Sequence, residues 1–163
     1  MAALPQLLEE DIAELNDALH DLLIKSESSA AVLIDKGGFV ITTTGDCANL
    51  DTMTLSALAA ASFAATQSLA DILGETNFSS VYQQGEKVSM LVINVDASCL
   101  LTIVFKANVS VGAVKYFARN TITKVVEQLK VSRDRDPEIK IDLSMLNLAD
   151  PSIVFKKKGK KAA

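Results

Sequence analysis

The side chains that could carry out chemistry are few and scattered. His20 is the only histidine, and it lies in a strongly acidic stretch without the organised neighbours that an acid, a base or a metal ligand needs. Cys47 and Cys99 are the only cysteines and form no CxxC pair, so we expect two reduced thiols that pack as small side chains. These residues predict neither a catalytic site nor a metal site.

Phosphate chemistry has no motif of its own in this chain. The sequence contains no GxxxxGK[ST] and no GxGxxG, and it has no GxSxG nucleophile elbow, so no nucleotide or other cofactor is expected. The only arginines are Arg119, Arg133 and Arg135. An arginine finger that stabilises a transferring phosphate is an alternative, but nothing in the sequence positions one. The residues therefore favour an interaction module over a self-sufficient enzyme.

Length and charge narrow the class of protein. A chain of 163 residues, 49% hydrophobic and 22% charged, corresponds to one globular domain. The net charge is −4, yet five lysines within 156–161 contribute +5, so residues 1–151 carry −9. An acidic body argues against nucleic acid as the main partner. The first residues lack the basic and then apolar order of a secretory signal, so a cytoplasmic protein is expected.

Hydrophobic periodicity predicts an α+β domain. Three segments have helical spacing and five have strand character, in the order α-β-β-α-β-β-β-α. The expected helices cover 4–25, 52–73 and 110–130, and the expected strands cover 31–35, 39–44, 77–83, 87–95 and 99–106. Short connections make the five strands an antiparallel sheet. The first helix is acidic and the last is basic, so we expect both on one face of the sheet and the middle helix on the other. The domain should span 1–131, followed by a flexible tail over 132–163 with a basic end.

The middle helix has no charged residue from Thr52 to Ala70. Its length approaches that of a membrane span, but its seven hydroxyl and amide side chains and the lack of basic and aromatic flanks favour a helix outside the membrane. Asp51 should cap its start and Gly74 its end. On a helical wheel the bulkier side, predicted to pack on the sheet, contains Leu55, Leu58, Ser62, Thr66, Leu69 and Leu73.

The other side of this helix carries small, uncharged residues: Ala57, Ala61, Ala64 and Ser68, flanked by Met53 and Ala60. Small residues allow another backbone to approach closely, and depletion of charge marks the core of an interface. We therefore predict a partner-binding surface made by Ala57, Ala60, Ala61, Ala64 and Ser68. An alanine-rich helix chosen only for its helix propensity is the alternative.

In their order, these segments resemble the roadblock/dynein-light-chain family. The resemblance covers about residues 5–131 and is carried by VLIDKGGFVITTTGD, DTMTLSALAAASFAATQSLADILGE, QQGEKVSMLVINV and LLTIVFKANVSVGAVKYFARNTITKVV. Within the family, the MglB-type proteins, bacterial partners of the Ras-like GTPase MglA, look most similar. The tail over 132–163 shows no family pattern.

The resemblance implies a homodimer whose sheets join edge to edge, with the two middle helices side by side. It also implies binding of a GTP-loaded Ras-like small GTPase and faster GTP hydrolysis through remodelling of its switch regions, without a donated arginine, in cell polarity and motility. Ala57, Ala61, Ala64 and Ser68 would face the GTPase; glycine is common near the last position in relatives. A scaffold that tethers a GTPase or motor component without changing turnover, and a dimer that senses a small molecule, remain alternatives.

Overall fold

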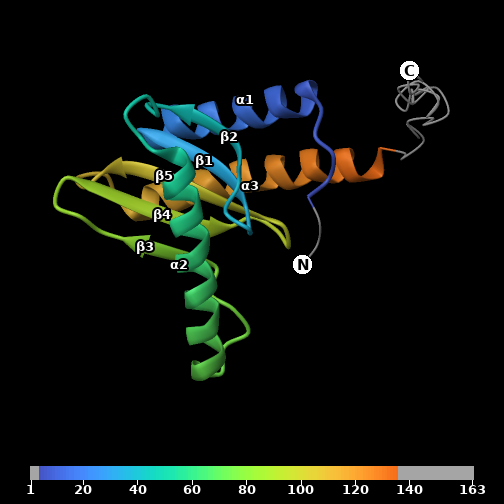
Figure 1. The fold of residues 1–163 in the computed structure, drawn as a ribbon. Helices are drawn as coiled ribbons and strands as arrows, with labels where there is room; N and C mark the ends of the chain where they lie inside the picture. The colour runs from blue at the N-terminus through green and yellow to red at the C-terminus, as the bar shows by residue number, and fades with distance from the viewer. Residues whose placement is uncertain (1–3, 136–163) are drawn as a thin grey trace, which may run out of the picture.

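The computed structural model describes residues 4–135 and has three layers, with an antiparallel sheet between two helical layers (Figure 1). The strand order in the sheet is β2-β1-β5-β4-β3. The elements are α1 (Glu9–Ser26), β1 (Ala30–Asp35), β2 (Val40–Gly45), α2 (Thr52–Leu73), β3 (Ser80–Gln83), β4 (Val88–Asn94), β5 (Cys99–Lys106) and α3 (Val111–Asp134). The predicted element order and the antiparallel sheet are confirmed.

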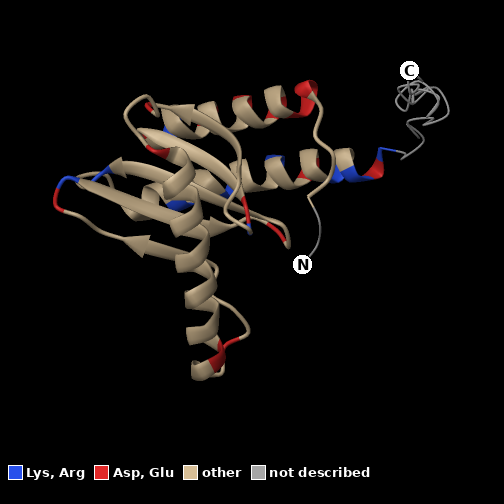
Figure 2. Cartoon of the chain, viewed as in Figure 1, with Lys and Arg blue, Asp and Glu red and all other residues tan. Residues whose placement is uncertain are grey.

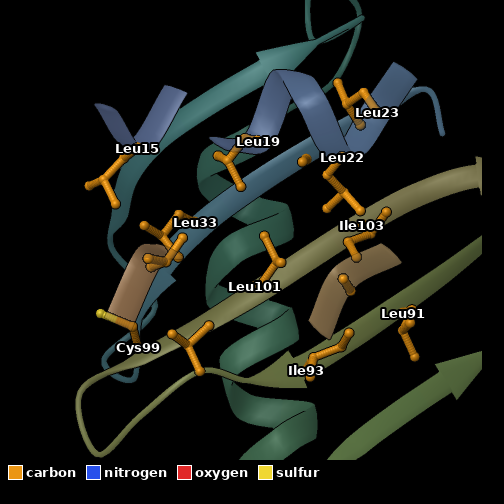
Figure 3. Close-up of a cluster of buried hydrophobic side chains, with 14 of the residues drawn as sticks. Leu15, Leu19, Leu22, Leu23, Leu33, Leu91, Ile93, Cys99, Leu101 and Ile103 are labelled. Atoms are coloured by element: carbon orange, nitrogen blue, oxygen red, sulfur yellow. The ribbon is translucent and has the colours of Figure 1, made fainter. Parts of the chain in front are cut away.

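Helices α1 and α3 pack side by side on one face of the sheet, and α2 lies on the other face (Figure 1). This placement of the three helices is the predicted one. The larger core lies under α1 and α3, where leucines of α1 meet aliphatic side chains of β1, β4 and β5 (Figure 3). The complementary charges on the two helices meet in one exposed ion pair, in which Lys124 Nζ lies 3.6 Å from Asp21 Oδ2. Such a pair contributes little energy but agrees with the predicted orientation.

Helix α3 continues to Asp134, beyond the predicted end at 130, and its last residues are tied to the rest of the domain. Arg133 Nη2 donates to Asp96 Oδ2 in the β4–β5 turn at 2.7 Å, and Arg135 donates from both Nη atoms to the Asp11 carboxylate at 2.8 Å. Most of the predicted tail, residues 136–163, lies outside the described residues.

Both ends of α2 are set by the predicted caps. Asp51 Oδ1 accepts a hydrogen bond from Thr54 N at 3.0 Å, which satisfies one of the free N–H groups of the first turn. Gly74 adopts the left-handed conformation, with φ of 75°, and its N–H bonds to carbonyls of the last turn. The helix bounds therefore follow directly from two residues.

The predicted sheet-facing side of α2 is wrong. Leu58, Leu69 and Leu73 are 64%, 55% and 69% exposed, whereas the buried residues are Ser56, Ala59, Ala60, Phe63 and Ala70. The helix is thus rotated by about 100°, one residue, from the expected orientation. The cause is close packing: the sheet supplies bulky side chains, Val32, Ile34, Val92 and Leu100, and the helix supplies small ones that let its backbone approach.

Candidate partner-binding surface on α2

The outward side of α2 carries most of the predicted partner-binding residues. Ala57, Ala61, Ala64 and Ser68 are all exposed and form what we call the small-residue stripe. The Ser68 hydroxyl donates back to Ala64 O at 3.5 Å, so it adds little polarity to the surface. Ala60 is the exception, because it is only 6% exposed and packs on the sheet. Along most of its length α2 carries no acidic or basic residue (Figure 2).

A second set of side chains on α2 is large, apolar and exposed. We call it the leucine strip, and its members are Leu58, Leu69 and Leu73; Ile72, which follows Ser68 by one turn, is 80% exposed beside them. Figure 1 shows why the residues near the end of α2 are uncovered: α2 runs across the strands, and its C-terminal part extends past β3, beyond the sheet. Such a group of exposed apolar side chains marks an interaction surface.

The edge of the sheet beside this overhang is open. Within residues 4–135, β3 pairs with β4 alone and leaves its other side without a strand neighbour. An open edge presents backbone N–H and C=O groups that can pair with another chain. The overhanging helix and the open edge thus lie at the same end of the sheet.

The β1–β2 turn borders the small-residue stripe. Gly38 has φ of 91°, and a Cβ atom placed there would lie 2.9 Å from the Ala57 Cα atom, so only glycine lets the turn lie this close to α2. Phe39, next in the turn, is 74% exposed. The turn therefore adds an aromatic side chain near the edge of the stripe.

Comparison with known proteins identifies the fold. The Roadblock/LC7 domain family matches residues 15–105, which is more than half of the chain. The chain belongs to this family. No curated protein sequence matches it.

Among solved structures, this roadblock domain is similar to several MglB proteins. Myxococcus xanthus MglB is 25% identical with a TM-score of 0.73, and the match covers 80% of this chain and 99% of that one. The gliding protein MglB of Thermus thermophilus is 26% identical with a TM-score of 0.72, covering 80% of this chain and 98% of that one. A structure titled "MglB with tetrameric arrangement" is 26% identical with a TM-score of 0.74, covering 81% and 99%.

Two of the three arginines, Arg133 and Arg135, are held in place by carboxylates of the domain, whereas Arg119 is exposed on α3, across the sheet from α2. Asp11 is fully buried and also accepts hydrogen bonds from Leu8 N and Gln128 Nε2, and its bonds with Arg135 hold its pKa well below the ordinary range. Arg133 also donates to Ser98 Oγ at 2.9 Å. Because both side chains serve internal contacts, neither is free to act as the arginine finger considered above.

The remaining candidate groups lie apart from α2. Burial raises the pKa of the Cys99 thiol to about 11, so it stays protonated at neutral pH.

In residues 4–135 no three His, Cys, Asp or Glu side chains come close enough to hold a metal ion. No helix of the described part of the chain is long and apolar enough to cross a membrane.

Sequence reasoning missed the leucine strip, although helix length could have revealed it. A helix of 22 residues is about 33 Å long, whereas five strands spaced about 4.8 Å apart extend for only about 19 Å. A helix that crosses the strands must therefore extend past the edge of the sheet by about nine residues. Leu69, Ile72 and Leu73 fall within that overhang.

Proposed function

We propose that this roadblock domain is a homodimeric regulator of a Ras-like small GTPase and accelerates GTP hydrolysis by remodelling the switch regions. The observation that carries the proposal is the exposed surface of α2, which has no charged residue from Thr52 to Ala70 and leaves Leu58, Leu69, Ile72 and Leu73 more than half exposed. Membership of the Roadblock/LC7 family and the similarity to MglB proteins support it. We place the protein in the cytoplasm, with a role in polarity or motility.

The leucine strip and the β3 edge would form the dimer interface. Two copies related by a two-fold axis would pair their β3 strands antiparallel, which continues the sheet from one copy into the other. The overhanging ends of the two α2 helices would then lie side by side, where Leu69 and Leu73 lose contact with water. Because the dimer has two-fold symmetry, the same contact covers the overhanging ends of both α2 helices.

The small-residue stripe would remain available for the GTPase. Ala57, Ala61, Ala64 and Ser68 would contact it, and their short side chains allow its backbone to come close. The domain would act by binding the hydrolysis-competent arrangement of the switch regions more tightly than the others. The GTPase would supply all the catalytic groups, since Arg133 and Arg135 are held by Asp96 and Asp11 and Arg119 lies on α3, on the opposite face of the sheet (Figure 1).

A scaffold that tethers the GTPase without changing its turnover would use the same surface. Single-turnover GTP hydrolysis by the Ras-like GTPase of the same genome, with and without this protein, distinguishes the two. Acceleration of about tenfold or more, equivalent to about 1.4 kcal/mol off the barrier, is the expected result. Binding without acceleration would contradict the activator role and leave the scaffold, and no binding would contradict both.

A further inference from the structure

A cavity of about 310 Å³ lies beside α2, on the side of the helix away from the leucine strip. Its walls come from α2, from the segment before β3, and from the ends of β4 and β5 next to the β1–β2 turn. The volume is at the lower end of the range for sites that bind small molecules.

The apolar part of the cavity suits a flat ring. Phe63 and Phe78 contribute aromatic surfaces, and Leu100 contributes an aliphatic one. The wall that contains Phe78 is fixed, because Gln67 Nε2 on α2 donates to Phe78 O at 2.9 Å. This hydrogen bond ties the backbone at Phe78 to α2.

The polar part of the cavity contains an acceptor without a donor. Asn94, the last residue of β4, lines the cavity, and its Oδ1 atom is buried and has no hydrogen-bond partner among the described residues. Because this oxygen has almost no accessible surface, the side-chain amide must rotate toward the cavity before a ligand can reach it. The backbone N–H of Asn94, by contrast, donates to Ser79 O at 2.9 Å. A buried acceptor left unpaired is unfavourable, so a ligand that donates an N–H to Asn94 would gain an interaction that the protein alone does not make.

Lys36 adds a positive charge to the same cavity. It belongs to the β1–β2 turn and is half-buried, and within residues 4–135 it forms no ion pair. A cation with no internal partner, next to an apolar cavity, favours a ligand that carries a negative group.

We propose that this cavity binds a small aromatic anion that bears an N–H group. The ring would lie against Phe63 and Phe78, the N–H would donate to Asn94 Oδ1, and the anionic group would pair with Lys36. Ala64 lines the cavity and belongs to the small-residue stripe, so an occupied cavity would change the border of the proposed GTPase surface. The binding itself does not depend on the proposed function.

Three indoles test the proposal on the full-length protein. Indole-3-acetate combines a ring, an N–H and a carboxylate; 1-methylindole-3-acetate lacks the N–H, and 3-methylindole lacks the carboxylate. We expect indole-3-acetate to bind about tenfold or more tightly than either analogue, and to shift the methyl NMR signals of Ala60, Ala64 and Leu100. Equal binding of all three indoles, or no binding, would overturn the proposal without any substitution.

Lys36→Met and Asn94→Leu then test the two polar contacts, and Lys106→Met is the control. Lys36→Met should weaken indole-3-acetate by about tenfold or more and leave 3-methylindole unchanged, whereas Lys106→Met, which changes an exposed lysine at the other end of β5, should alter neither. Asn94→Leu should abolish the preference for indole-3-acetate over its N-methyl analogue. If the indoles bind the exposed leucine strip instead, all three variants will bind them as the wild type does, and the proposal is wrong.

Discussion

Replacing Leu69 by glutamine should dissociate the proposed dimer. Leu69 is 55% exposed in the overhang of α2, and glutamine keeps the helix propensity while it removes the branched apolar side chain. Full burial of a leucine contributes about 1.5–3 kcal/mol. Loss of burial of the exposed part of Leu69 in both copies should therefore cost about 2–3 kcal/mol per dimer, which raises the dimer Kd by about 30- to 150-fold.

Ile24 provides a matched control. It is 66% exposed, but it lies on α1, which covers the opposite face of the sheet. Ile24→Gln removes a similar amount of exposed apolar surface and should leave the dimer Kd unchanged. Sedimentation equilibrium over a range of protein concentrations measures both variants, and circular dichroism confirms that both keep their helices.

The reasoning would be refuted by either of two results. The first is a wild-type protein that sediments as a monomer at every concentration, since the leucine strip would then be uncovered in solution. The second is an equal effect of Ile24→Gln and Leu69→Gln, because the interface would then not be specific to the overhang. A larger effect of Ile24→Gln would place the dimer interface on the α1 side of the sheet.

Three further substitutions test other parts of the molecule. Ala64→Arg should leave unfolding unchanged, because Ala64 is exposed, but it should weaken GTPase binding by more than about tenfold through bulk and an unpaired interfacial charge. Gly38→Ala should destabilise the domain by about 1–3 kcal/mol in urea unfolding, whereas Gly37→Ala should cost less, because φ is not positive there and the added Cβ meets only the Asp35 side chain, at 3.2 Å. Arg135 holds the pKa of Asp11 below its ordinary 3.8, so this pair stabilises the fold at neutral pH and loses its effect as pH falls below about 4. The difference in Tm between wild type and Arg135→Met should accordingly be largest at neutral pH and shrink in acid.

Most helices and strands could be predicted from the sequence because side-chain patterns and hydrogen bonds within a few residues determine where they form. Asp51 and Gly74 set the ends of α2 through hydrogen bonds within one turn, and alternating apolar residues identify the strands. The start of α1 is less well predicted: the pattern assigns Leu4 to Leu8 to the helix, which begins at Glu9. There Leu8 N donates to Asp11 Oδ2 at 2.7 Å, so the capping group is an aspartate that the pattern alone did not single out.

The orientation of α2 could not be predicted because its sequence is nearly uniform around the helix. With no charged residue from Thr52 to Ala70, solvent imposes almost no preference, and the bulky leucines suggested the wrong side. The shape of the sheet decides instead, since β-branched and leucine side chains already fill the layer and leave room for Ala59 and Ala60. The arginine contacts were equally hidden, because Arg135 and Asp11 are 124 residues apart in the chain.

The one-residue rotation also changes how the surface of α2 is divided. Had the leucines packed on the sheet, α2 would expose only small residues, and a single surface would have to serve both the second copy and the GTPase. The observed orientation exposes two sets of side chains, with Leu58, Leu69 and Leu73 on one side and Ala57, Ala61 and Ala64 on the other. Leu69→Gln and Ala64→Arg therefore test separate contacts. A GTPase that needs the dimer will bind Leu69→Gln normally once the protein concentration exceeds the raised dimer Kd, whereas Ala64→Arg will fail at every concentration.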